Sequence, residues 1–129
     1  MYLVTGGAGF IGSNLAAALA ERGDAVVVCD WLGRDERWRN LAAHELADLI
    51  TPEALPAWLA RSGARLSAVI HLGAISSTTE TDVDLIVHHN VRATLDLLQW
   101  CTEYQVRFLY ASSAATYGDG SAGFDRSEE

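Results

Sequence analysis

The sequence predicts an α/β domain built on a parallel sheet of about five strands in the order 3-2-1-4-5. Strand-like apolar segments alternate with segments of helical pattern, which is typical of parallel strands joined by helices. Near the N-terminus an apolar strand, a turn with glycines at positions 6, 9 and 12, and a helix follow without a break. A run of branched residues then ends at Asp30. A sheet of this order places a ligand crevice between strands 1 and 4, at their carboxyl ends.

The expected elements follow from local signals along the chain. Gly23 is a natural helix stop, and Thr51 followed by Pro52 is typical of a helix start. The long helix near the C-terminus offers an apolar face of Leu85, Val91, Leu95, Leu98 and Cys101. In chain order we expect a strand over Tyr2–Val4, a helix ending at Gly23, a strand over Ala25–Cys29, a polar loop with a short helix over Trp31–Asn40, a weak strand over Leu46–Ile50, a helix from Thr51 to about Ser62, a strand over Ser67–Leu72, a helix over Val83–Tyr104 and a strand over Val106–Ala111.

Length and composition indicate one globular domain. The chain has 129 residues, of which 50% are hydrophobic and 20% charged. Residues 1–117 are expected to form a Rossmann-like domain, and residues 118–129 a polar tail, a truncated loop. The net charge of −8 argues against a nucleic-acid partner. Without a long apolar run or signal-peptide pattern, a cytoplasmic location and no membrane partner are expected.

Cysteine and histidine usage predicts no metal site. Cys29 and Cys101 lie in apolar stretches far apart in the sequence, so we expect buried, reduced thiols. The four histidines form no ligand spacing with cysteines or carboxylates.

The turn over Gly6–Gly12 predicts dinucleotide binding. Gly6 can adopt backbone angles closed to other residues, Gly9 lets the backbone approach phosphates, and Gly12 allows close packing of the helix on its strand. Asp30 stands where an acid accepts hydrogen bonds from the adenosine ribose. Alone it favours NAD, but three nearby arginines could offset its charge for NADP. These are Arg34, Arg37 and Arg39.

Two further stretches are expected to line the crevice. Asp48 and Leu49, at the end of the third strand, could line an adenine pocket or form a surface turn. Small residues after His71 would let the cofactor pass, and hydroxyls over Ser76–Glu80 suit a sugar or phosphate, although they also suit a helix cap. We expect His71 to be a hydrogen-bonded residue at the strand end instead of an acid or base.

Ser112 and Ser113 follow the last strand and would face the nicotinamide. A serine hydroxyl there can hydrogen-bond a substrate oxygen as it changes between alcohol and carbonyl.

The chain resembles the extended short-chain dehydrogenase/reductase family. The segment Gly6–Gly12 is similar to its cofactor signature, and Ser112–Gly118 to its active-site serine strand. Within that family, His71–Glu80 and Phe108–Gly118 resemble the ADP-glyceromanno-heptose 6-epimerases. The resemblance covers essentially the whole chain, but only the N-terminal part of such an enzyme.

The resemblance implies a role for individual residues. Ser113 takes the place of the catalytic serine, and Arg37 that of a basic residue for the NADP 2′-phosphate. Trp31 departs from the small polar residue usual at its position, which leaves NAD possible beside NADP. The remaining implied contacts are Phe10 and Ile11 with the phosphates, Asp30 and Trp31 with the adenosine ribose, Leu72, Gly73, Ala74, Ile75 and Ser76 with the middle of the cofactor, and Asn90 with the nicotinamide ribose. From their hydroxyls, Ser77, Thr78, Thr79 and Ser113 are the residues expected to contact the sugar.

The resemblance implies a parent enzyme that epimerises C6 of an ADP-linked heptose by transient oxidation with bound NADP. Its product would serve lipopolysaccharide synthesis, and the parent enzyme would be a homo-oligomer. Enzymes of this family use a tyrosine with a lysine four residues on, and this chain contains no lysine. We therefore expect a fragment that is inactive alone. The alternatives are a sugar-nucleotide 4-epimerase or 4,6-dehydratase, and a non-catalytic dinucleotide-binding module.

Overall fold

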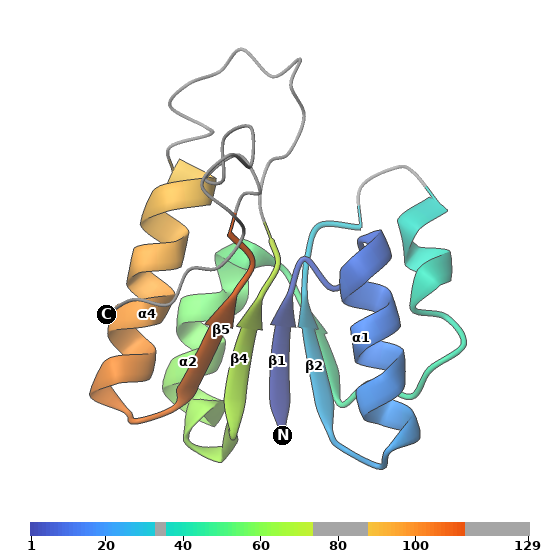
Figure 1. Ribbon diagram of the computed structural model, residues 1–129, viewed down its shortest axis with the longest axis horizontal. Coiled ribbons are helices and arrows are strands. Elements are labelled where there is room, and N and C mark those ends of the chain that lie inside the picture. Colours follow the sequence, from blue (N-terminus) through green and yellow to red (C-terminus); the bar gives the residue numbers. More distant parts are fainter. Residues whose placement is uncertain (33–35, 74–87, 113–129) are drawn as a thin grey trace, which may run out of the picture.

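The described chain forms a parallel sheet flanked by helices on both faces (Figure 1). The computed structural model describes residues 1–32, 36–73 and 88–112, with residues 37, 88 and 89 described by their backbone. None of the helices in these ranges combines the length and apolar character needed to cross a membrane.

Five short strands alternate with helical segments, as the sequence pattern predicts. The strands are β1 Tyr2–Thr5, β2 Val26–Cys29, β3 Asp48–Ile50, β4 Ala68–His71 and β5 Arg107–Tyr110. The α-helices are α1 Phe10–Glu21, α2 Leu55–Ser62 and α4 Ala93–Glu103. The short 3-10 helices are η1 Glu36–Asn40, η2 Pro52–Ala54 and η3 Gly63–Arg65, and η4 His88–Arg92 is a π-helical turn that leads into α4.

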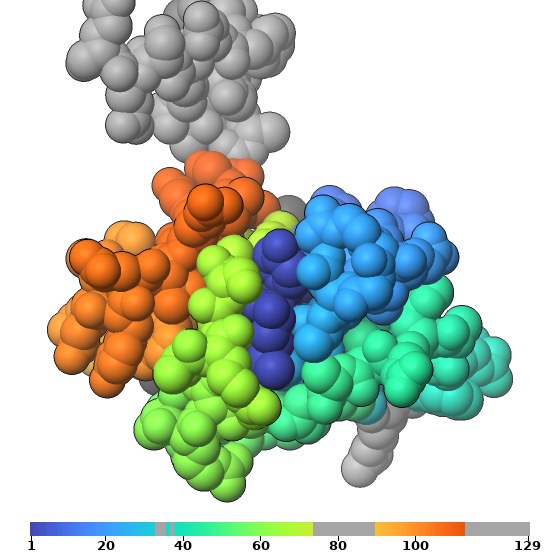
Figure 2. Space-filling model, turned by 90° about the horizontal axis from the view of Figure 1, so that it is seen from below, coloured from blue at the N-terminus to red at the C-terminus, as the bar shows by residue number. Residues whose placement is uncertain are grey.

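The strand order is β3-β2-β1-β4-β5, which confirms the predicted topology. Leu3 in β1 pairs in parallel with Val27 on one side and Val69 on the other. Seen from below, the first residues of the chain therefore lie at the centre of the molecule, between the segments of β4 and β2 (Figure 2). The strand order reverses between β1 and β4, which is where a crevice at the carboxyl edge is predicted.

Alternate residues of the central strands feed two separate cores. Leu3, Val27 and Val69 face α2 and α4, where they pack with Trp58 and Leu97. On the opposite face, α1 covers the other set of strand residues, which includes Val4, Val26 and Val28. Because β2 is buried at every position, its sequence is a continuous apolar run instead of an alternating one.

The predicted apolar face of the last helix is largely wrong. Leu97 and Cys101 are buried against the sheet, whereas Leu95 and Leu98 are exposed. The segment carries two apolar stripes, and the contact with β4 and α2 selects the one through Leu97. Position 85 of the predicted face lies outside the described residues.

The third strand and the following helix begin later than predicted. The strand β3 starts at Asp48, and a 3-10 turn that begins with Pro52 precedes α2. Thr51 is extended, as an N-cap residue should be, but its side chain makes no capping hydrogen bond. Proline therefore sets this helix start without a hydroxyl cap.

Candidate functional site

The glycine turn follows β1 directly and closes through backbone contacts. The N–H of Gly6 donates to the carbonyl of Cys29 over 2.9 Å, and the N–H of Gly9 donates to the carbonyl of Gly6 over 3.1 Å. Gly6 has a φ of 67°, and a Cβ there would lie 2.7 Å from the nitrogen of Gly73. Position 6 thus requires glycine for its backbone conformation and for the close approach of the β4 loop.

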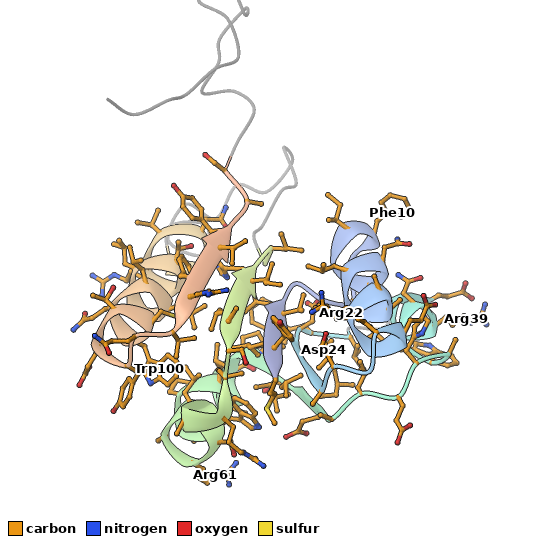
Figure 3. The ribbon with its side chains drawn as sticks, turned by 60° about the horizontal axis from the view of Figure 1, so that its bottom comes forward. Phe10, Arg22, Asp24, Arg39, Arg61 and Trp100 are labelled. Carbon is orange, nitrogen blue, oxygen red and sulfur yellow. The ribbon has the colours of Figure 1, made fainter. Side chains whose placement is uncertain are left out.

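Helix α1 starts at Phe10, within the glycine turn. A Cβ on Gly12 would collide with the carbonyl oxygen of Gly6 and lie 2.8 Å from the Cα of Gly7. Gly12 therefore allows the helix to pack on the turn itself, where the sequence suggested close packing on the strand. Phe10, the first residue of α1, is 84% exposed and points away from the sheet (Figure 3).

The start of α1 has the electrostatic character of an anion site. The first N–H groups of a helix have no partner within the helix, and the helix dipole places partial positive charge there. The first turn of α1 carries no acidic side chain. The start of α1 therefore suits a pyrophosphate, as in other glycine-rich turns.

Asp30, directly after β2, holds the glycine turn through its carboxylate. Its Oδ2 accepts the Ala8 N–H over 2.9 Å, and its Oδ1 accepts the Trp31 N–H over 2.8 Å. Each carboxylate oxygen retains a second lone pair that can accept a ribose hydroxyl. The neighbouring Trp31 indole donates to Oε1 of Glu53 over 2.8 Å, which ties this end of the crevice to η2.

Asn40 contacts the glycine turn, which the sequence pattern did not predict. Its Nδ2 donates to the carbonyl of Ala8 over 2.9 Å, across thirty-two positions of sequence. Asp30 accepts from the Ala8 N–H, so side chains hydrogen-bond both the N–H and the carbonyl of Ala8. Nothing in the polar, arginine-rich stretch before Asn40 distinguishes it as a partner of the turn.

The end of β4 is joined to β1 by backbone and hydroxyl contacts. Leu72 donates its N–H to the carbonyl of Thr5 over 3.1 Å, and Gly73 donates its N–H to the Thr5 Oγ1 over the same distance. The structure thus brings Leu72 and Gly73 to the glycine turn, and their contact with a cofactor stays a prediction. The predicted residues Ala74, Ile75, Ser76, Ser77, Thr78, Thr79 and Ser113 lie outside the described residues.

His71 is fully hydrogen-bonded, as predicted for this strand end. Its Nδ1 lies 2.6 Å from the Thr5 hydroxyl and its Nε2 lies 2.8 Å from the Thr94 hydroxyl. Thr94 in turn donates to the carbonyl of Asn90 over 2.9 Å. Burial lowers the pKa of the His71 imidazole from its usual value near 6.5.

Asp48 and Leu49 begin β3 instead of ending it. Asp48 pairs with Val27, below the end of β2, and its Oδ2 accepts the indole N–H of Trp58 over 2.9 Å. That carboxylate joins the third strand to α2. The role of these two residues at the adenine remains a prediction, and their position in the strand does not add support to it.

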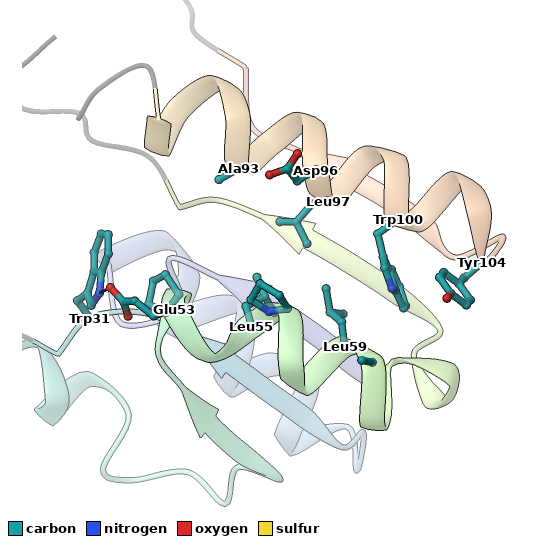
Figure 4. Close-up of a pocket in the computed structure, with 12 residues that line it drawn as sticks. Trp31, Glu53, Leu55, Leu59, Ala93, Asp96, Leu97, Trp100 and Tyr104 are labelled. Atoms are coloured by element: carbon teal, nitrogen blue, oxygen red, sulfur yellow. Dashed lines mark hydrogen bonds between the residues drawn. The ribbon is translucent and has the colours of Figure 1, made fainter. Parts of the chain in front are cut away.

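A cavity of about 790 Å³ lies between α2 and α4 and reaches Trp31 (Figure 4). Leu55, Leu59 and Leu97 form much of its apolar wall, and Trp100 stacks on Tyr104 at its far end with ring centroids 4.7 Å apart. Its lining includes Glu53 at the Trp31 end, but neither Asp48 nor Leu49.

Both cysteines are buried free thiols, as predicted. Burial raises the pKa of Cys29 to about 12, with smaller effects from Asp30 and Glu53. Across residues 1–32, 36–73 and 88–112, no three His, Cys, Asp or Glu side chains group together as metal ligands would.

The glycine turn at the start of α1, with an acid at the end of the adjacent strand, defines a dinucleotide-binding α/β domain. The model of the NAD dependent epimerase/dehydratase family matches residues 2–129. The chain belongs to this family.

Individual relatives agree with the family match. The ADP-L-glycero-D-manno-heptose-6-epimerase of Nitratidesulfovibrio vulgaris (strain DP4) is 43% identical over 127 residues, which are 96% of this chain and 39% of the relative. The chain thus spans about two fifths of that relative's length.

Solved structures of similar fold extend the comparison. The crystal structure of the Helicobacter pylori ADP-L-glycero-D-manno-heptose-6-epimerase superposes with a TM-score of 0.78 at 30% identity, covering 98% of this chain and 43% of that one. The Bordetella bronchiseptica enzyme WbmH, solved in complex with NAD⁺, gives a TM-score of 0.76 at 30% identity over 91% of this chain and 40% of that one.

Proposed function

We propose that the chain is the cofactor-binding part of a sugar-nucleotide epimerase whose substrate is an ADP-linked heptose. The observation that carries the proposal is the glycine turn against Gly73, with Asp30 bound to the turn at Ala8. This arrangement leaves amides at the start of α1 for a pyrophosphate and a carboxylate for the adenosine ribose. The heptose is supported by the name of the relative that is 43% identical over nearly the whole chain.

The residues present fit a nicotinamide dinucleotide. Because Gly6 has no Cβ, the glycine turn and the loop after β4 lie in backbone contact at Gly6 and Gly73. The cofactor, when bound, would take up a hydride from C6 of the sugar and return it to the opposite face. The chain's part is to hold the phosphates at the turn, orient the adenosine at Asp30, and present the hydroxyl of Ser113 to the reacting oxygen.

NADP is proposed in preference to NAD because of Arg37. A guanidinium can neutralise the 2′-phosphate that the Asp30 carboxylate would repel. NAD is the alternative cofactor, since Trp31 occupies a position where the resembling family carries a small polar residue. The cavity that starts at Trp31 offers an apolar surface next to the adenosine end.

The isolated chain is proposed to bind dinucleotide weakly and not to catalyse epimerisation. A tyrosine acts as acid or base best when a neighbouring cation lowers its pKa. The tyrosines are Tyr2, Tyr104, Tyr110 and Tyr117, and none has a lysine four residues on.

The test measures binding and turnover separately. NADPH fluorescence and calorimetry should show binding to the 129-residue chain, while an assay with ADP-D-glycero-D-manno-heptose should show no L-glycero product. The coding sequence that surrounds the chain should, when expressed whole, convert ADP-heptose and leave UDP-glucose unchanged. Turnover of UDP-glucose alone would contradict the heptose proposal, and absence of NADPH and NADH binding to either protein would contradict the cofactor proposal.

A further inference from the structure

His71 lies at the point where three elements of the cofactor edge meet. It ends β4, it is buried, and its ring stacks on Phe108 of β5 at a centroid distance of 6.1 Å. Its two ring nitrogens contact hydroxyls from different elements, Thr5 of β1 and Thr94 of α4. The imidazole therefore bridges the first strand to the last helix.

The direction of each hydrogen bond follows from two backbone groups, the carbonyl of Asn90 at one end of the network and the N–H of Gly73 at the other. A carbonyl can only accept, so the Thr94 hydroxyl donates its one hydrogen to Asn90. Thr94 must then accept from His71, which places a hydrogen on Nε2. At the other end the Gly73 N–H donates to Thr5, which leaves the Thr5 hydroxyl hydrogen for Nδ1.

A charged imidazole does not fit this arrangement. With hydrogens on both nitrogens, His71 would donate to Thr5 at a hydroxyl that already accepts from Gly73. The Thr5 hydroxyl hydrogen would lose its acceptor in a site that is almost closed to water. Burial disfavours the charged ring for the same reason, which agrees with the lowered pKa of His71.

We propose that His71 is a positioning residue that holds the cofactor edge together as the neutral Nε2–H tautomer. The resulting sequence of donors runs in one direction, from Gly73 through Thr5, His71 and Thr94 to the carbonyl of Asn90. Hydrogen bonds aligned in this way polarise one another. They fix Gly73 against Gly6 at one end and the π-helical turn before α4 at the other.

The consequence for the cofactor rests on the proposed function. Gly6 and Gly73 border the crevice where the phosphates would pass, and the resemblance places Asn90 near the nicotinamide ribose. A histidine that touches neither group would thus set the distance between the two cofactor contacts.

The first test reads the tautomer in the 129-residue chain. Nitrogen-15 correlation spectra of labelled histidines distinguish the Nε2–H ring, the Nδ1–H ring and the charged ring, and the His71→Gln variant assigns the signal. We expect the Nε2–H pattern, retained on acidification below the pH at which free histidine charges. An Nδ1–H pattern, or titration at the ordinary pKa, would overturn the proposal.

The second test separates the two halves of the bridge with conservative variants. An asparagine oxygen can replace Nδ1 toward Thr5 but is too short to reach Thr94. A glutamine N–H can replace Nε2 toward Thr94 but leaves Thr5 without its acceptor. We expect amide exchange about tenfold faster in the π-helical turn of His71→Asn, and about tenfold faster at Gly73 in His71→Gln.

Thr94→Val and Thr102→Val form a matched pair for this experiment. Both threonines lie on α4 and donate to the carbonyl four residues back, but only Thr94 contacts the imidazole. Thr94→Val should reproduce the effect of His71→Asn, and Thr102→Val should leave both ends unchanged. Equal effects of His71→Asn and His71→Gln at both ends, or of the two threonine variants, would show a merely space-filling histidine.

The final arm measures NADPH affinity in the same variants. His71→Asn and Thr94→Val should bind about tenfold more weakly than the parent chain, and Thr102→Val within twofold. If the parent binds and all variants bind equally, the positioning role is overturned and the cofactor proposal stands. If the parent binds neither NADPH nor NADH, the cofactor proposal and with it the cofactor role of His71 fail, while the exchange results still decide whether the bridge exists.

Discussion

The backbone N–H of Ala8 donates to Oδ2 of Asp30 over 2.9 Å, so the acid that ends β2 holds the glycine turn directly. An acid at this position is usually explained by the ribose alone. Here the same carboxylate also accepts from Trp31, and the turn depends on it before any ligand arrives. The proposed ribose contact and the folding of the turn would therefore depend on the same side chain.

The variant Asp30→Asn tests this double role. An amide has one acceptor oxygen, so its NH₂ group would face one of the two backbone N–H donors at Ala8 and Trp31. We expect a loss of about 1–2 kcal/mol in the free energy of unfolding, measured in urea without ligand, and weaker dinucleotide binding. Asp24→Asn is the control, since Asp24 pairs with Arg22 at the surface over 2.6 Å. Similar losses in both variants would contradict the role of Asp30 in the turn.

Gly6→Ala and Gly23→Ala separate backbone strain from collision. Both glycines have positive φ, 67° and 85°, but a Cβ on Gly23 meets nothing within 4 Å. Gly23→Ala should therefore lower the free energy of unfolding by about 1 kcal/mol, the cost of the left-handed conformation. At Gly6 the contact with Gly73 adds overpacking, so we expect a further loss of about 1–3 kcal/mol. Thermal and urea unfolding of both variants measure the difference, and equal losses would show that the β4 loop yields to the new methyl group.

Arg37→Ala should weaken NADP binding more than NAD binding. Loss of one charge-assisted contact to the 2′-phosphate should weaken NADP binding by about tenfold and leave NAD within twofold. Arg39→Ala is the matched control because the Arg39 guanidinium already pairs with Glu36 over 2.9 Å and lies over the Trp38 ring. Calorimetric titration with both dinucleotides provides the measurement. Equal losses for the two cofactors would remove Arg37 from the 2′-phosphate site.

Cys29 should resist alkylation while the chain is folded. Burial raises the pKa of its thiol from 9.0 to about 12, and only the thiolate reacts. The folded state binds the proton more tightly than the unfolded state, so this contribution to stability is complete below pH 9 and is lost as the pH rises toward 12. Mass spectrometry after iodoacetamide treatment at pH 8 should show Cys29 modified only when urea unfolds the chain. Rapid modification under native conditions would contradict the burial of this β2 residue in the core.

The parts of the fold that short-range signals determine could be predicted from the sequence. The glycine spacing, the branched run of β2 and the alternation of strands with helices are local, and the strand order is the one typical of the dinucleotide-binding fold that this pattern indicates. The exposed face of α4 could not be predicted, because Leu95 and Leu97 are equally apolar and only the position of the sheet distinguishes them.

The same limit applies to the candidate site. Gly6 and Asp30 carry signals within one motif, and the structure places them at the predicted edge. Asn40 and Thr94 contribute through single hydrogen bonds to residues more than twenty positions away. Such partners depend on how the elements come together in space, which no spacing along the chain encodes.

The central position of β1 has a consequence for the order of folding during synthesis. Tyr2 pairs with Val26 on one side, but its neighbour on the other side is Ala68. A ribosome therefore releases β1, α1 and β2 long before the strand that completes them, and closing that connection carries the entropy cost of a long loop. The glycine turn is made well before Gly73, so it acquires its opposing wall only after α1, β2, β3 and α2 have been made.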